Sequence, residues 1–191
     1  MFIEEYPGAV SPDLCKKIIA LFEADPGQEP SSVNFNGRKK FQNIRTGTRV
    51  KPNSEAWQPL IEGLAPAFID TMRRYVTKYP GLQHLTNAEE LVFVGPVIER
   101  VLPGQGFGWH VDHSAATWQR VVAGLLYLSS INDGGSTEFA DQAQHVRSDE
   151  GKIVLFPPYW THFHRGITPT TQTKYVVGYF WSYPSPPSTP A

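Results

Sequence analysis

The sequence predicts a mainly β fold of the sandwich or jelly-roll type, flanked by α-helices. From residue 91 onward, short runs of β-branched and aromatic residues are separated by Gly, Pro and Asp, a pattern typical of antiparallel strands joined by turns. Aromatic residues make up 13% of the chain, and 16 Gly and 17 Pro supply many turn positions. A length of 191 residues is sufficient for one domain with a sizeable core.

Two helices are expected before this β region. The first covers residues 11–25, because Ser11 is a favourable N-cap and Pro12 suits the first helical position. Its apolar side chains recur at helical spacing: Leu14, Ile18, Leu21 and Phe22. The second runs from about residue 54 to residue 79 and ends before a Pro-Gly pair. Both apolar stripes are interpreted as surfaces that pack against the core.

The segment between the two helices, residues 34–49, is rich in Gly, Asn and basic residues and has no clear period. It predicts a loop or hairpin. Its cations are Arg38, Lys39, Lys40, Arg45 and Arg49. The simplest interpretation is a solvated loop, and the alternative is a lid that closes over an acidic or peptide substrate.

Five runs in the second half of the chain predict strands. They cover residues 91–102, 107–112, 120–129, 152–158 and 174–183. The sequence contains no internal repeat and no boundary between two independent units. We therefore expect one domain over residues 1–183, with helical support at about 1–90 and a β core at about 91–183. Residues 184–191 form a Pro-rich tail that we expect to be disordered.

The charge balance argues against nucleic acid or a membrane as the partner. Seventeen basic and 18 acidic side chains give a net charge of −1, so no global field attracts a polyanion. No apolar run approaches the roughly 20 residues needed to span a bilayer, and the first residues do not resemble a signal peptide. Because Cys15 is the only cysteine, no intrachain disulfide can form. We expect a soluble, cytoplasmic protein.

The histidines indicate a metal site. His110 and Asp112 are two residues apart on a predicted strand, so both side chains project to one face. This pair alone is weak evidence, but His164 follows in the run at 159–166, which we expect to contain a further strand. Two imidazoles and one carboxylate form the facial triad that leaves three coordination positions open, whereas a closed zinc site would favour cysteines. His162 could replace His164 as the ligand, because the two alternate onto the same face.

Lys174, ten residues after His164, is a candidate anion-binding residue on the last predicted strand. A buried ammonium would require an anionic partner, and a dicarboxylate that also chelates the metal would supply one. The alternative is an exposed lysine that protects a sheet edge. Tyr127, on the predicted strand at 120–129, can be a packed core aromatic with its hydroxyl bonded locally.

Several motifs appear together and in order between about residues 100 and 181. Gly104 and Phe107 precede the His-x-Asp pair, and Arg120 precedes Tyr127 by seven residues. The run at 134–139 reads Gly-Gly-Ser-Thr-Glu-Phe, and His164-Arg-Gly is followed by Lys174. This set resembles the non-haem Fe(II)/2-oxoglutarate dioxygenases, and within them the prolyl 4-hydroxylase-like branch.

The resemblance implies a double-stranded β-helix, a jelly-roll or cupin-like core. It also implies three Fe(II) ligands: His110, Asp112 and His164. Lys174 would bind the far carboxylate of 2-oxoglutarate, and Tyr127 would give that cosubstrate a hydrogen bond. With O2 as second cosubstrate, the reaction would yield succinate, CO2 and a hydroxylated substrate. The carboxylate of Asp112 disfavours the related halogenases. Two residues are candidate substrate contacts: Arg120 and Trp181.

Two departures from the branch concern the substrate. Val101 stands where many such sequences carry Tyr, and Phe180 stands where Trp is usual. The expected function is hydroxylation of a peptidyl proline or a related substrate. One alternative is a hydroxylase of a small molecule or free amino acid, so that the partner is either a peptide or a small molecule. Another is a catalytically silent jelly-roll protein that binds metal for structure.

Overall fold

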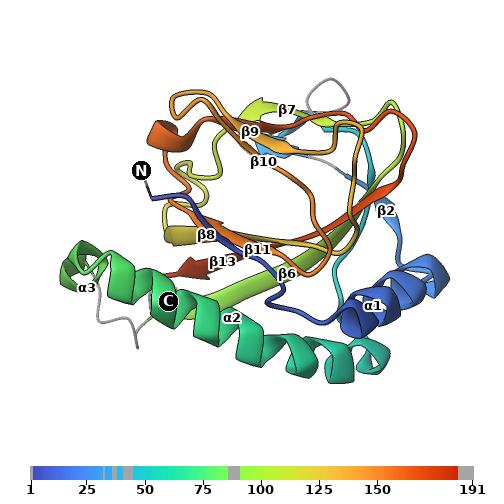
Figure 1. Ribbon diagram of the computed structural model, residues 1–191, viewed down its shortest axis with the longest axis horizontal. Coiled ribbons are helices and arrows are strands. Elements are labelled where there is room, and N and C mark those ends of the chain that lie inside the picture. Colours follow the sequence, from blue (N-terminus) through green and yellow to red (C-terminus); the bar gives the residue numbers. More distant parts are fainter. Residues whose placement is uncertain (1, 32, 36–37, 41–44, 86–90, 185–191) are drawn as a thin grey trace, which may run out of the picture.

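The computed structural model describes residues 2–184 except residue 32 and the segments 36–37, 41–44 and 86–90. These residues form three layers, with helices on one side, a seven-stranded sheet in the middle and a four-stranded sheet on the other side (Figure 1). Because the two sheets face each other, the predicted mainly β, jelly-roll class is confirmed. The tail predicted at 184–191 lies, apart from Pro184, outside the described residues.

The larger sheet has the strand order β1-β11-β8-β13-β6-β5-β2, and its neighbouring strands are antiparallel. Its strands are β1 (Glu4–Tyr6), β2 (Glu29–Pro30), β5 (Thr48–Val50), β6 (Val92–Val101), β8 (Arg120–Tyr127), β11 (Ile153–Phe156) and β13 (Lys174–Ser182). Four of the predicted strands are confirmed here, as β6, β8, β11 and β13. The sequence predicts only helices and a loop or hairpin before residue 91. It therefore misses β1, β2 and β5, which are short and gain stability by pairing with distant strands.

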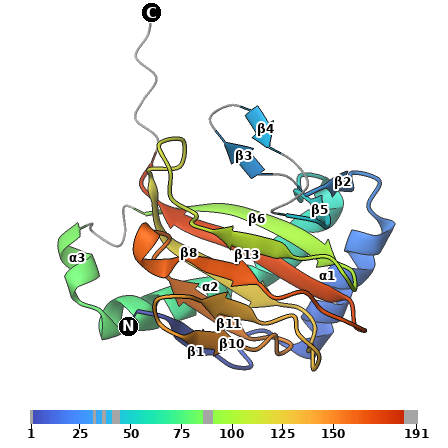
Figure 2. The same cartoon turned by 90° about the horizontal axis from the view of Figure 1, so that it is seen from above.

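The smaller sheet has the strand order β10-β9-β12-β7. Its strands are β7 (Phe107–His110), β9 (Thr137–Phe139), β10 (Gln144–Val146) and β12 (His164–Gly166). The strands predicted to carry His110 and His164 are confirmed as β7 and β12. A hairpin of β3 (Val33–Phe35) and β4 (Arg38–Lys40) extends from the body near β2 and β5 (Figure 2), and it confirms a hairpin in the basic segment.

Both predicted long helices are confirmed. Helix α1 (Pro12–Ala24) begins after Ser11, whose hydroxyl accepts a hydrogen bond from the Leu14 amide at 3.3 Å. A 3₁₀ turn, η1 (Glu55–Trp57), leads into α2 (Gln58–Lys78), and a short α3 (Gly81–Leu85) follows. A second 3₁₀ turn, η3 (Trp160–His162), precedes β12. Helices α1 and α2 cover the face of the larger sheet that is turned away from the smaller one (Figure 1).

Strand β13 divides the apolar side chains between two cores because successive residues point to opposite faces. Val177 and Tyr179 pack on the helical side, whereas Val176 and Phe180 pack in the interior between the two sheets. Lys174 shares the parity of Val176, and it too is buried. The side chain of Lys174 therefore points into the interior between the two sheets.

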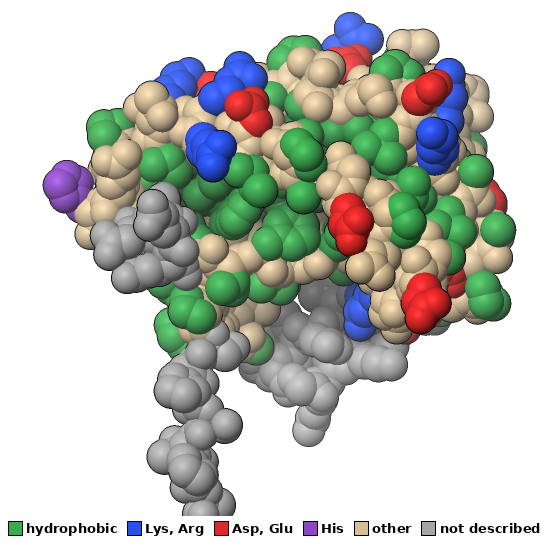
Figure 3. Space-filling model, turned by 90° about the horizontal axis from the view of Figure 1, so that it is seen from below, with side chains coloured by type: hydrophobic (Ala, Val, Ile, Leu, Met, Phe, Trp, Pro, Cys, Tyr) green, Lys and Arg blue, Asp and Glu red, His purple; other side chains and the backbone are tan. Residues whose placement is uncertain are grey.

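The helical face carries acidic and basic side chains that are interspersed rather than separated by sign (Figure 3). In the part of the chain that the structure describes, no helix has the length and apolar character needed to cross a membrane.

Candidate metal centre

The edge strand β7 of the smaller sheet and its neighbour β12 bring the three predicted ligands together. The register of β7 and β12 places His164 directly opposite His110, and Asp112 follows β7 by two residues. Nε2 of His110 lies 3.8 Å from Oδ1 of Asp112, and Nε2 of His164 lies 3.6 Å from Oδ2. One potential ligand atom from each of the three side chains lies within 4.8 Å of the other two. This spacing is suitable for coordination of one cation.

Hydrogen bonds to backbone carbonyls orient both imidazoles. Nδ1 of His110 lies 2.8 Å from the Gly108 carbonyl, and Nδ1 of His164 lies 2.9 Å from the His162 carbonyl. Each Nδ1 therefore donates a proton, and each Nε2 keeps a lone pair directed at the cluster. Burial, and after it the neighbouring His164, lowers the pKa of His110 to about 3. This imidazole is therefore neutral at neutral pH.

The carboxylate is held by the loop that follows β7. The backbone amide of Asp112 donates to the Pro158 carbonyl at 3.1 Å. The Asp112 carbonyl accepts hydrogen bonds from the Thr117 hydroxyl at 2.9 Å and from Nη1 of Arg120 at 2.8 Å. These contacts fix the backbone at Asp112, so its side chain meets the imidazoles with little freedom to rearrange.

The donor set fits Fe(II). Two neutral imidazoles and one carboxylate on one side of a cation leave three coordination positions for exchangeable ligands. His162, the alternative ligand, is buried as well, but its Nδ1 lies 2.9 Å from the Thr161 hydroxyl, and it is not a member of the three-residue cluster. Its backbone carbonyl orients His164 instead. The geometry therefore favours His164 as the ligand.

Lys174 is buried at the start of β13, in the centre of the larger sheet. The alternative of an exposed lysine at a sheet edge is therefore wrong. Its ammonium donates to the Gly135 carbonyl at 2.6 Å and lies 5.0 Å from the centroid of the Tyr127 ring. Burial lowers the pKa of Lys174 to about 8, and the charge of Glu99 partly opposes this shift. The ammonium is still mostly protonated at neutral pH and can bind an anion.

Tyr127 is fully buried beside Lys174, and its hydroxyl donates to the Thr137 hydroxyl at 2.7 Å. The hydroxyl proton of Tyr127 is thus used within the protein. The Thr137 hydroxyl can donate its own proton onward, and Thr137 is also buried. Tyr127 and Thr137 together form a hydroxyl pair at the Lys174 end of the interior. The sequence contains Thr137 in the 134–139 motif but does not single it out.

The structure adds Arg45 and Glu99, which the sequence does not single out as site residues. The Arg45 guanidinium binds the buried Glu99 carboxylate through two nitrogens, with Nε 2.9 Å from Oε1. The same guanidinium lies 4.4 Å from the centroid of the Phe107 ring, and that ring stacks on the His110 imidazole at 3.5 Å. A residue of the basic segment thus reaches the wall of the metal cluster.

The two candidate substrate residues are placed differently. Arg120 lies next to the cluster, with its guanidinium 3.6 Å from the centroid of the Phe180 ring. Trp181 points to the opposite face of β13, where it contacts Phe93 in the helix-covered core. The structure therefore separates Trp181 from the cluster and places Phe180 on the cluster side, because neighbouring strand residues face opposite ways.

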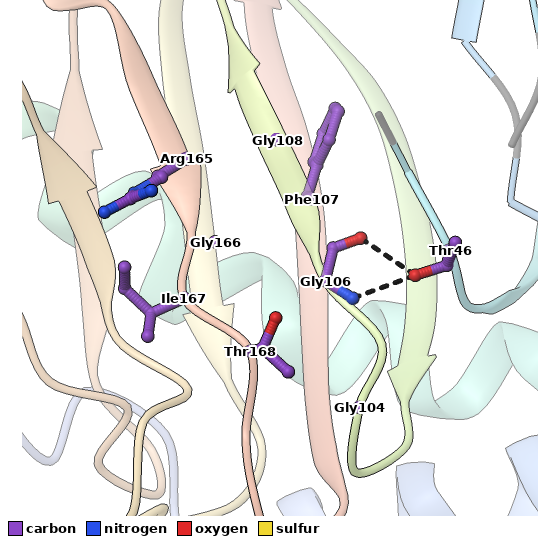
Figure 4. Close-up of a pocket in the computed structure, with 9 residues that line it drawn as sticks. All are labelled: Thr46, Gly104, Gly106, Phe107, Gly108, Arg165, Gly166, Ile167 and Thr168. Carbon is purple, nitrogen blue, oxygen red and sulfur yellow. Dashed lines mark hydrogen bonds between the residues drawn. The ribbon is translucent and has the colours of Figure 1, made fainter. Parts of the chain in front are cut away.

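An open groove of about 480 Å³ lies along the same two strands, beyond the ligands (Figure 4). Much of its lining is glycine, including Gly106, Gly108 and Gly166, so backbone atoms form a large part of its surface. The Thr46 side chain closes one side through hydrogen bonds with the Gly106 amide and carbonyl. Lys174 and Tyr127 do not line this groove.

Comparisons with known proteins agree with this site. The family model of the 2OG-Fe(II) oxygenase superfamily matches residues 97–182. A PKHD-type hydroxylase of Xanthomonas axonopodis pv. citri is 31% identical over 100 residues, which cover 46% of this chain and 42% of the relative. Another PKHD-type hydroxylase, of Klebsiella pneumoniae, is 27% identical over 147 residues, which cover 71% of this chain and 61% of that relative. The chain thus spans between two fifths and three fifths of the length of these relatives.

A solved structure shares the fold at low sequence identity. The viral collagen prolyl hydroxylase of Paramecium bursaria Chlorella virus-1, in its 2-oxoglutarate complex, superposes with a TM-score of 0.71 at 16% identity. The superposition covers 96% of this chain and 97% of the viral one. This likeness extends beyond the β core to the N-terminal helices.

Proposed function

Because this chain is a 2OG-Fe(II) oxygenase of the prolyl 4-hydroxylase-like branch, we propose that it hydroxylates a peptidyl proline or a closely related substrate. Fe(II), 2-oxoglutarate and O2 are the cofactor and cosubstrates of this family. Succinate and CO2 are the proposed coproducts. The proposed ligands are His110, Asp112 and His164.

One observation carries the proposal. The three ligand atoms lie within 4.8 Å of one another, and a buried ammonium, that of Lys174, lies in the interior between the sheets that carry them. A dicarboxylate that chelates a cation at one end needs a second positive charge for its far end. This chain places the metal ligands and the second positive charge in the same interior. The side chains of Tyr127 and Thr137 lie beside the ammonium.

When bound, Fe(II) and 2-oxoglutarate would supply the electrons that activate O2, the oxidant of the reaction, which is chemistry that the protein side chains lack. The protein supplies ligation, orientation and exclusion of water. His164 is enclosed by two aromatic rings of the interior, with centroids 5.4 Å (Phe139) and 4.9 Å (Phe156) from that of its imidazole. These rings keep bulk water from one side of the cluster and preserve the Nδ1 hydrogen bond that orients the ligand.

The open side of the cluster suits a chain-like substrate. Val94 is paired directly with Phe180 in the register of β6 and β13, so the two share a face, and Val94 is 44% exposed. The Arg120 guanidinium lies over Phe180 and also holds the Asp112 carbonyl. The apolar surface formed by Val94 and Phe180 can pack against the ring of a proline substrate. The Arg120 guanidinium beside it can donate a hydrogen bond to a peptide carbonyl. A small metabolite would need a more enclosed site than this surface.

A spectroscopic experiment tests the metal and cosubstrate assignment. Anaerobic addition of Fe(II) and then 2-oxoglutarate to the purified protein should produce a visible metal-to-ligand charge-transfer band. Absence of the band in iron-loaded protein would support the catalytically silent alternative and overturn the proposed function.

A product experiment tests the substrate. The protein is incubated with Fe(II), 2-oxoglutarate and O2 together with proline-containing peptides, free proline or other amino acids. Succinate is measured, and mass spectrometry detects the gain of one oxygen, because turnover without a substrate also releases succinate. Oxygen gain on free amino acids but not on peptides would replace the peptidyl assignment with the small-molecule alternative.

A further inference from the structure

A buried acid lies beside the cation that is proposed to receive 2-oxoglutarate. In the register of β6 and β13, Glu99 pairs with Val176 and Lys174 pairs with Val101. Glu99 and Lys174 are therefore diagonal neighbours on one face of the sheet, a relationship in which long side chains can reach each other. Both side chains are buried, and the charge of Glu99 raises the pKa of Lys174 against the larger effect of burial.

This arrangement would oppose the binding of an anion if Glu99 were unpaired. A free carboxylate in the interior would attract the ammonium of Lys174 and repel the far carboxylate of 2-oxoglutarate. In the structure, Lys174 and Glu99 do not form such a pair. Among the residues that the structure describes, no ion pair within 4.0 Å involves Lys174, and its ammonium donates instead to the neutral carbonyl of Gly135.

Arg45 accounts for this difference. Nε of Arg45 lies 2.9 Å from Oε1 and 3.1 Å from Oε2 of Glu99, and Nη2 also donates to Oε2, so both carboxylate oxygens are bound. The backbone of Arg45 forms a β-bridge with Phe107, and its guanidinium lies over the Phe107 ring. Backbone pairing and ring stacking thus hold the guanidinium against Glu99 at a fixed place in the wall.

We infer that Arg45 is a positioning residue for 2-oxoglutarate: by binding both oxygens of Glu99, it leaves the Lys174 ammonium available for the far carboxylate. This inference rests on the proposed function. In this inference Arg45 acts through its contacts with Glu99 and not through a contact of its own with the cosubstrate. The basic segment therefore contributes a charge to the pocket wall, in addition to any role that its remaining residues have as a lid.

Ligand binding to a set of variants tests the inference. Arg45→Gln, Glu99→Gln and the double variant are loaded anaerobically with Fe(II), and the dissociation constant of 2-oxoglutarate is measured by calorimetry and by the charge-transfer band. Arg45→Gln should weaken binding by about tenfold or more, because the unpaired Glu99 then competes for Lys174. Glu99→Gln should bind within about threefold of the parent protein, and the double variant should recover most of the loss.

A second ligand distinguishes charge competition from general damage. 2-Oxobutanoate keeps the 2-oxo acid end of 2-oxoglutarate but lacks the far carboxylate, so its affinity should be nearly the same in all three variants. Arg100→Gln is the matched control, since Arg100 follows Glu99 on β6, points to the opposite face over the Phe22 ring and pairs with Glu23 of α1. This control variant should bind 2-oxoglutarate and 2-oxobutanoate with the same affinity as the parent protein. Arg45→Lys keeps the charge and should lose less affinity than Arg45→Gln.

Three results would overturn the inference. One is unchanged 2-oxoglutarate affinity in Arg45→Gln, another is a double variant as weak as the single one, and the third is an equal loss for 2-oxobutanoate. If Arg45→Gln does not fold, Arg45→Lys replaces it: this variant should lose part of the 2-oxoglutarate affinity that the double variant keeps, and equal affinity in the two would overturn the inference. Failure of the parent protein itself to bind 2-oxoglutarate would contradict the proposed function instead.

Discussion

His164 lies directly opposite His110 in the antiparallel β7–β12 pair, and each imidazole directs its Nδ1 to the carbonyl of the residue two positions before it. Register sets the distance between the rings, whose centroids are 4.2 Å apart, and the carbonyl bonds set their rotation. Because backbone atoms determine both quantities, the pair is prepared for a cation before one arrives. Asp112, fixed by the loop after β7, completes the cluster.

Replacing a ligand histidine should abolish tight metal binding. His110→Ala and His164→Ala each remove one of three protein ligands, so we expect the affinity for Fe(II) or Co(II) to fall by about a hundredfold or more. Metal content after dialysis, determined by mass spectrometry, measures the change.

His162→Ala is the control, because its backbone carbonyl, which orients His164, is retained. We expect its metal affinity to stay within about tenfold of the parent value, the lower end of losses seen for outer-shell changes. Loss of metal with His162→Ala and retention with His164→Ala would reverse the ligand assignment.

Lys174→Ala should weaken 2-oxoglutarate binding while iron binding is retained. The substitution removes a charge-assisted contact of about 1.5–3 kcal/mol, so the dissociation constant should rise by roughly 10- to 150-fold. Calorimetry with metal-loaded protein checks this, and 2-oxobutanoate should be affected much less. Loss of iron in the variant would contradict the role assigned to Lys174.

The affinity for 2-oxoglutarate should fall as the pH rises through about 8. Burial lowers the pKa of Lys174 to about 8, and the dianion binds the protonated form. Affinity should therefore be nearly constant well below this pKa and decrease by about tenfold per pH unit above it. Titrations across this range with Co(II)-loaded protein measure the slope. Lys174→Arg, which keeps its charge, should give a flat profile, and a flat profile in the parent would contradict this prediction.

Tyr127→Phe should have a smaller effect than Lys174→Ala. In the structure the Tyr127 hydroxyl donates to Thr137, so its removal costs about 1 kcal/mol of stability and at most about tenfold in 2-oxoglutarate affinity. Thermal unfolding and calorimetry provide the two measurements. A loss of affinity equal to that of Lys174→Ala would mean that Tyr127 turns its hydroxyl to the cosubstrate, as the family resemblance implies.

Local spacing predicts the pair of His110 and Asp112, whereas the burial of Lys174 is predicted only together with the family motifs. His110 and Asp112 are two residues apart, and Lys174 starts a strand with clear alternation. The same alternation predicts that Phe180, and not Trp181, shares the face of Lys174. The structure places Phe180 on that side, next to the cluster, and Trp181 on the opposite side. Strand alternation along β13 thus favours Phe180 over Trp181 as the candidate substrate contact.

The pair of Arg45 and Glu99 could not be predicted in the same way. Its two members are separated by 54 residues, and Arg45 lies in a segment with no period. Only the β-bridge to Phe107 and the pairing of β5 with β6 bring this segment to the wall. Such contacts depend on tertiary packing, which local sequence patterns do not report. The short strands β1, β2 and β10 escape prediction for the same reason.

Gly124→Ala should destabilise the fold on the side away from the cluster. Gly124 pairs directly with Tyr179, and a Cβ at this position would lie 2.2 Å from Cζ of the tyrosine ring. That ring is fully buried and stacked on Phe68 at 4.2 Å, so it has little room to move. We expect a loss of about 1–3 kcal/mol and a Tm lower by roughly 2–12 °C in thermal unfolding. Gly178→Ala is the matched control, since a Cβ there meets no atom within 4 Å, and an equal loss in both variants would contradict the steric explanation.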